Sequence, residues 1–176
     1  MSFLGVRSAY AITSGASGRI AADSVAGRDG SDTLRSIERL QFSDGVLAFD
    51  NLRTENAGKG YLIYRAAFDR APDSPGLGYW IRELDRGQDF GSVVAASFIA
   101  SDEFIRLNGA STSNAQFVDR LYQNVLHRAG EADGVAYWLG ELNNGGARSN
   151  MLASFAISAE NVNNVAPLIG DGIWFV

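Results

Sequence analysis

The chain lacks cysteine and has one histidine, His127, among 176 residues. The absence of cysteine excludes disulfide bonds, thiol nucleophiles and thiolate metal sites. One histidine cannot build a histidine-based metal site, and a Ser-His-Asp triad would have to use it. No Gly-x-Ser-x-Gly nucleophile motif and no phosphate-binding loop is present, and Gly15 to Gly18 predicts only a turn. The sequence therefore offers none of the common catalytic signatures.

Positive charge and long apolar runs are also scarce. The formal net charge is −5, and no basic stripe appears, so we expect no nucleic-acid partner. No run approaches the ~20 apolar residues that span a bilayer, so we expect no transmembrane segment. Residues 1–13 lack the charged start and apolar stretch of a secretory signal peptide. If the protein is exported, we expect its address elsewhere in the chain.

What the chain does have is an internal repeat. Tyr64–Arg70 corresponds to Tyr122–Arg128, and Gly76–Leu84 corresponds to Gly134–Leu142. Trp80 and Trp138, 58 positions apart (138 − 80), mark the same place in both copies. A repeated helical unit of this kind predicts a packed scaffold before it predicts an active site.

The first 50 residues predict a small β-rich segment. Its strand candidates are Ser8–Thr13 and Arg19–Val25, followed by a hairpin around Ser43–Gly45. Leu34, Ile37 and Leu40 have helical spacing, which predicts a short helical turn capped by Asp32 or Thr33.

From about residue 52 the apolar period changes to near 3.6, which predicts amphipathic helices. We expect a mainly α fold, with a compact helical domain over 51–166 built from related repeats at about 61–107 and 117–163. Residues 167–176 are expected to form a C-terminal tail. Trp80 and Trp138 lie on apolar helix faces, so we expect their rings to pack together at the centre of a shared core.

The helical repeats resemble a known family. Asp69–Asp73, Gly76–Trp80 and Ser97–Phe104 resemble the family called domain of unknown function 4214, which is itself similar to the helical linker domains of phycobilisomes. The resemblance covers roughly Ala57 to Val165. The second copy departs from it, with Ala129-Gly130-Glu131 and Ser158–Asn161 in place of the first copy's sequences.

The segment Gly30–Gly45 has a second resemblance. It is similar to the segment that follows calcium-binding glycine-rich repeats in RTX-type exported proteins. Those proteins leave the cell by type I secretion with an uncleaved C-terminal signal. The resemblance implies an extracellular or cell-surface address, export machinery as a partner, and no catalysis. The corresponding candidate signal here is an acidic residue followed by apolar residues: Asp171, Ile173, Trp174, Phe175 and Val176.

One possible metal site follows from the same resemblance. Gly27–Leu34 aligns with a glycine-rich calcium repeat and offers Asp29 and Asp32 as ligands, although Arg28 stands where glycine is expected. Calcium takes about six to eight oxygens, and one repeat cannot supply them. The favoured alternative is a turn in which Asp32 caps a helix.

For three other groups of residues we favour a structural role over a catalytic or binding role. Arg70 with Asp73, and Arg128 with Glu131, predict loop-bracing ion pairs or helix caps rather than the paired carboxylates of a glycosidase. His127 predicts a surface or loop-bracing residue. The tryptophans predict core packing, with stacking on carbohydrate as the alternative.

Together these observations predict a non-enzymatic secreted or cell-surface interaction domain of an RTX-like exported protein, with calcium as its one candidate cofactor. The alternative is a carbohydrate-binding or polysaccharide-processing accessory module. A cell-surface protein or a polysaccharide is the expected partner.

Overall fold

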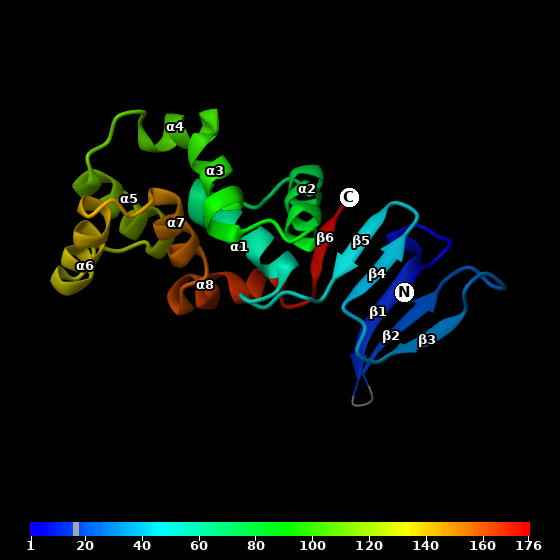
Figure 1. Cartoon of the computed structure of the whole chain (residues 1–176). Helices are drawn as coiled ribbons and strands as arrows, with labels where there is room; N and C mark the ends of the chain where they lie inside the picture. The colour runs from blue at the N-terminus through cyan, green and yellow to red at the C-terminus, as the bar shows by residue number, and fades with distance from the viewer. Residues whose placement is uncertain (16–17) are drawn as a thin grey trace.

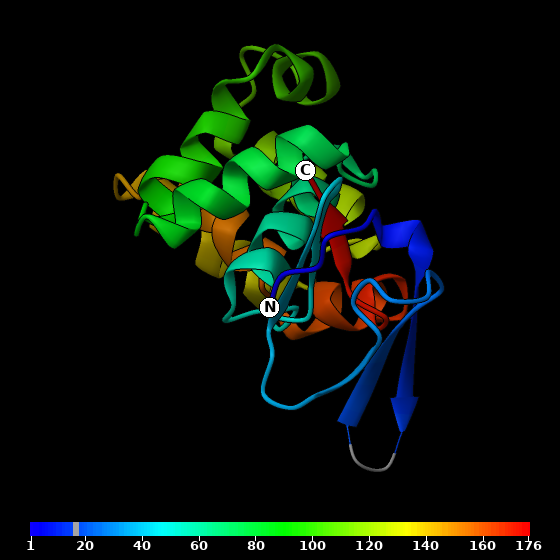
Figure 2. The same ribbon diagram turned by 90° about the vertical axis from the view of Figure 1, so that its right-hand side faces the viewer.

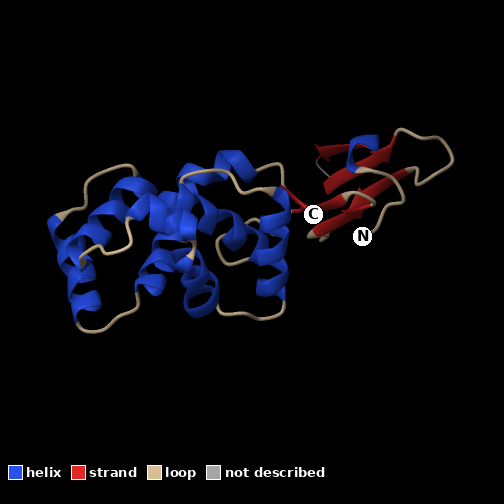
Figure 3. Ribbon diagram, turned by 90° about the horizontal axis from the view of Figure 1, so that it is seen from above, coloured by secondary structure: helices blue, strands red, loops and turns tan. Residues whose placement is uncertain are grey.

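The computed structural model describes residues 1–15 and 18–176. The chain is mainly α, with an N-terminal β part beside a larger helical part (Figures 1 and 3). Over these residues there are eight α-helices and two antiparallel three-stranded sheets. No helix in the described ranges is both long and apolar enough to cross a bilayer.

The first sheet has the order β1-β2-β3 and the second β4-β5-β6. The strands are β1 Tyr10–Gly15, β2 Gly18–Asp23, β3 Ser31–Leu34, β4 Arg39–Phe42, β5 Gly45–Ala48 and β6 Ile173–Phe175. The two predicted strands and the predicted hairpin are confirmed, with bounds shifted by one or two residues. The turn predicted at Gly15 to Gly18 includes residues 16 and 17, which lie outside the described residues.

The predicted helical turn near Leu34 is wrong. Asp32 lies in strand β3 opposite Ala21 of β2, so it caps no helix. Ser36 has a φ of 51°, which turns the chain between β3 and β4. Leu34 and Leu40 are both buried in the β core, so their spacing reflects two strands facing one core rather than one helix face.

The helical part consists of two sets of four helices. The first set is α1 Asn56–Phe68, α2 Ser74–Asp85, α3 Ala96–Ala100 with a preceding π-helical turn Phe90–Ala95, and α4 Asp102–Asn108. The second set is α5 Asn114–Leu126, α6 Ala132–Asn143, α7 Arg148–Ala156 and α8 Ala159–Ile169. Side-chain caps fix several starts: Ser101 accepts from the Phe104 amide, and Ser113 forms a capping box with Gln116.

Corresponding helices of the two sets contact each other. Helix α1 packs on α5, and the π-helical turn with α3 packs on α7. Helix α1 also packs on α7, so the two sets of helices share one core. The shared core is aliphatic and phenyl-rich; its fully buried side chains include Leu62, Ile81, Phe117, Leu121 and Leu152.

The tryptophans do not form the centre of this core, which corrects the prediction. Trp80 packs against Phe98 and Trp138 against Phe155, each within its own repeat, with ring centroids 5.4 and 5.6 Å apart. Both indoles are only half-buried. The rings lie away from the middle of the core because α1, α5 and α7 pack on one another there, whereas α2 and α6 each pack mainly on the first helix of their own set.

Strand β6 joins the two parts of the molecule (Figures 1 and 2). It pairs with β5, so that Leu47 lies opposite Trp174 and Val46 opposite Phe175. Side chains alternate along a strand. Ile173 and Phe175 therefore enter the helical core, while Trp174 packs against the β core.

Candidate functional site

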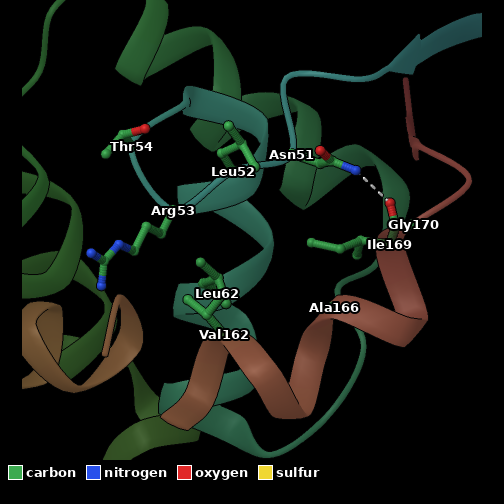
Figure 4. A pocket seen from close by; sticks show the side chains of 9 residues that line it. All are labelled: Asn51, Leu52, Arg53, Thr54, Leu62, Val162, Ala166, Ile169 and Gly170. Atoms are coloured by element: carbon green, nitrogen blue, oxygen red, sulfur yellow. Dashed lines mark hydrogen bonds between the residues drawn. The ribbon is translucent and has the colours of Figure 1, made fainter. Parts of the chain in front are cut away.

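An apolar pocket of about 410 Å³ lies between α1, α8 and the segment before α1 (Figure 4). Leu62, Val162 and Ile169 supply its apolar wall, and Leu52 stands beside them with 62% of its surface exposed. The other lining residues are Asn51, Arg53, Thr54, Ala166 and Gly170. Its volume falls within the range of small-molecule sites, and its wall suits an apolar group.

One hydrogen bond and one glycine fix the position of the segment before α1, which forms a wall of the pocket. The Asn51 side-chain amide donates to the Ile169 carbonyl at 2.7 Å, which ties the end of α8 to the segment before α1. A Cβ on Gly58 would lie 2.1 Å from the Leu52 carbonyl oxygen, so only glycine lets this segment lie so close to α1. The shape of the pocket therefore depends on close backbone packing that no side-chain motif in the sequence predicts.

The polar groups of the pocket lie at its rim. Arg53 extends away from Leu62 and Ile169, as Figure 4 shows. The nine lining residues include no carboxylate and no histidine. This pocket therefore has the means to bind by shape and apolar contact, with one cation at its edge, and no group for acid–base chemistry.

Each repeat carries an arginine brace, and the two braces match. Arg70 donates from Nε and Nη2 to the Glu103 carboxylate at 2.8 and 2.9 Å. Arg128 does the same to Glu160 at 2.7 and 2.8 Å. Each arginine also donates to the carbonyl of the next residue, so the brace ties the loop after the first helix of a repeat to its fourth helix.

The predicted partners of these arginines are confirmed as additional contacts. Arg128 pairs with Glu131 at 2.6 Å. Arg70 lies 3.9 Å from Asp73, whose carboxylate caps α2 by accepting from the Gly76 amide. Hydrogen bonds from the arginines hold the pKa of Glu103, Glu131 and Glu160 below their ordinary range. These carboxylates are thus ionised at neutral pH and unsuited to act as general acids.

His127 lies at the surface between the repeats. It ends α5 in a left-handed conformation, as Asp69 ends α1, and the two side chains face each other with Nε2 and Oδ1 3.8 Å apart. Both are about half exposed. This position agrees with the predicted loop-bracing role.

The two candidate calcium ligands, Asp29 and Asp32, have different surroundings. Asp29 accepts hydrogen bonds from the Leu4 amide at 2.9 Å and from the Tyr10 hydroxyl. Asp32 lies on β3, and Arg28 pairs with Asp23 at 2.6 Å beside Asp29. No group of three or more His, Cys, Asp or Glu side chains within residues 1–15 and 18–176 is arranged to hold a metal ion.

The candidate export residues do not form a free tail. Asp171 is exposed, but Ile173 and Phe175 are buried, and Trp174 packs on the β core. Arg82 donates to the Val176 carbonyl at 3.3 Å. A Cβ on Gly78 would lie 2.1 Å from that carbonyl oxygen, which explains glycine here where the second repeat has Ala136. The signal role of these residues stays a prediction.

Sequence reasoning missed the α1–α8 pocket and the partners Glu103 and Glu160. The glutamates had a detectable signal, because both repeats keep Glu at the second position after the capping serine while their neighbours differ. The pocket had none, since its residues come from both ends of the helical part.

Comparison with known proteins gives one result for the helical part. No curated protein and no solved structure matches the chain significantly. Residues 95–165, which run from the end of the π-helical turn into α8, match the family described as "Domain of unknown function (DUF4214)", and over these residues the resemblance predicted from the repeats is confirmed.

Proposed function

We propose that the chain is a non-enzymatic interaction domain of an exported protein, in which the α1–α8 pocket receives an apolar group of a cell-surface partner. The observation that carries this proposal is the pocket itself, an apolar hollow with exposed Leu52 at its mouth. Apolar surface that stays open in a folded domain is characteristic of binding sites.

The arrangement of charged groups supports a non-catalytic role. The acidic side chains near the repeat loops are held by Arg70 and Arg128 in bidentate pairs. A glycosidase needs one carboxyl group with a raised pKa, whereas Glu131 and Glu160 have lowered pKa values. The charged groups therefore stabilise loops.

We further propose export through a type I machine that reads the segment from Asp171 to Val176. Because Ile173 and Phe175 are buried in the folded chain, the machine would have to read this segment before β6 pairs with β5. Export of an unfolded chain is compatible with the absence of cysteine, since no disulfide is required afterwards.

Pocket filling tests the binding proposal. Ala166→Phe places a ring in the pocket from its exposed wall on α8, and Asn163→Phe adds the same ring elsewhere on that helix. We expect purified wild-type protein and Asn163→Phe to bind intact cells of the producing strain equally, and Ala166→Phe to bind at least tenfold less. Equal binding by all three proteins would contradict the proposal.

Export is tested with a charge reversal that spares the fold. Asp171→Lys changes an exposed residue of the candidate signal, and Asp119→Lys makes the same change on exposed α5 surface. In a host with the cognate exporter, we expect Asp171→Lys alone to accumulate inside the cell. Normal secretion of Asp171→Lys would remove the signal hypothesis while leaving the pocket proposal intact.

A further inference from the structure

We propose that the second repeat carries a separate binding site for a neutral pyranose sugar. The site is an open hollow of about 370 Å³ beside Trp138, between α5, α6 and the start of α8. It shares no lining residue with the α1–α8 pocket, so it stands independently of that proposal.

One aromatic substitution between the repeats creates room for this hollow. In the first repeat, Phe68 stacks on Phe98 with ring centroids 5.2 Å apart, and the Arg70 guanidinium lies 5.3 Å from the Phe68 ring. The second repeat has Leu126 at the corresponding position. The second repeat thus keeps the brace and the tryptophan but has one ring fewer between them.

The aromatic side of the hollow is suited to a sugar ring. Trp138 is half-buried and lines the hollow together with Phe155, whose ring centroid lies 5.6 Å from the indole, and the exposed Tyr137 ring lies 5.0 Å from the indole. An indole that is held in place by packing and lines an open hollow can stack on the C–H face of a pyranose without reorganisation. Trp138, like Trp80, therefore lies at the edge of the core rather than at its centre.

The polar side of the hollow can pair with sugar hydroxyls. Glu131 and Glu160 line it, and both carboxylates are already oriented by Arg128 at 2.6 to 2.8 Å. Each carboxylate oxygen can accept more than one hydrogen bond, so capacity remains for hydroxyl donors. Ser158 adds a hydroxyl at the start of α8.

Charge favours a neutral ligand over an ion. Two carboxylates and one guanidinium leave a net charge of −1 at the rim, which disfavours phosphates and carboxylates. A cationic ligand would have to compete with Arg128, which is bonded to both glutamates. A neutral polyol adds hydrogen bonds without breaking these pairs.

The three tryptophans provide a direct measurement, since each indole N–H gives its own NMR signal. We would titrate the protein with the methyl α-pyranosides of glucose, galactose and mannose, with tetramethylammonium as the cation probe. The Trp138 signal is assigned from Trp138→Phe. We expect at least one glycoside to shift the Trp138 signal in a saturable manner and to leave Trp80 unmoved.

Swapping the repeat residues supplies matched variants. Leu126→Phe installs the ring of the first repeat and is expected to abolish the shift, whereas Phe68→Leu in the first repeat is expected to preserve it. Glu131→Gln, on the exposed rim, tests the site without touching the core and is expected to weaken sugar binding about tenfold. No shift with any glycoside, equal shifts at Trp80 and Trp138, or a shift with tetramethylammonium alone would each overturn the proposal.

Discussion

Replacing Phe175 with alanine is expected to destabilise both parts of the molecule at once. The ring is 97% buried (3% exposed) and belongs to the helical core, although its backbone lies in the second sheet. Gly78 of α2 lies beneath it, and the Arg39 guanidinium lies 5.9 Å from the ring. The substitution thus opens a cavity where sheet and helices meet.

The expected cost follows from the size of that cavity. Phe→Ala changes in well-packed cores reduce the free energy of unfolding by about 3–5 kcal/mol. A domain of ordinary stability has about 5–15 kcal/mol in total. Phe175→Ala is therefore expected to lower the midpoint of urea unfolding substantially. Tyr137→Ala, which removes an aromatic ring that is 59% exposed, is expected to change the free energy of unfolding by less than about 0.5 kcal/mol.

Two signals make the experiment specific. With Trp80 and Trp138 replaced by phenylalanine in every protein compared, indole fluorescence reports on Trp174 beside the β core, and far-ultraviolet circular dichroism reports on the helices. We expect both unfolding curves to shift together in Phe175→Ala, because β6 contributes to both cores. A loss below about 1 kcal/mol, or a shift of one curve alone, would refute the conclusion that β6 couples the two parts.

Three further predictions concern charged groups. Arg39 of β4 donates to Asp50 at 2.6 and 3.0 Å and also pairs with Asp85 of α2. Arg39→Met leaves the nearly buried Asp50 without this partner, so we expect it to lower the free energy of unfolding in urea by about 1–3 kcal/mol. An unchanged urea midpoint would contradict this prediction. Hydrogen bonds from Arg70 lower the pKa of Glu103 in the folded state, so the Arg70–Glu103 pair stabilises the fold above the ordinary carboxyl pKa and loses this effect as the pH falls through the lowered pKa. The difference in unfolding free energy between wild type and Glu103→Gln should therefore vanish on acidification. A difference that grows on acidification would be inconsistent with this prediction. The Asp29 carboxylate already accepts hydrogen bonds from the Leu4 amide and the Tyr10 hydroxyl, so millimolar calcium is expected to leave the melting temperature unchanged. A calcium-dependent rise in melting temperature that Asp29→Asn abolishes would instead establish the calcium site.

The helical elements could be predicted from the sequence because their signals are local. Apolar spacing and the repeated Arg-loop-acid pattern act within a few residues, and the structure confirms the helices and the Arg128–Glu131 pair. The repeat itself indicated that corresponding helices belong together.

The remaining features depend on contacts between distant residues. Pairing of Val46 with Phe175 joins positions 129 apart (175 − 46), and nothing local to either strand specifies it. The same holds for the Asn51–Ile169 contact that shapes the α1–α8 pocket. The spacing of Leu34 and Leu40 was misleading because a helix face and two strands over one core can share the same apolar period.

The pairing of β6 also sets an order of events in biosynthesis. Residues 173–175 are translated after every other strand and helix described. Until they are available, the second sheet has only β4 and β5, and the space that Ile173 and Phe175 fill in the helical core stays open. A nascent chain would therefore remain incompletely folded until this late strand appears. Under the export proposed above, such a delay would keep the chain competent for transport.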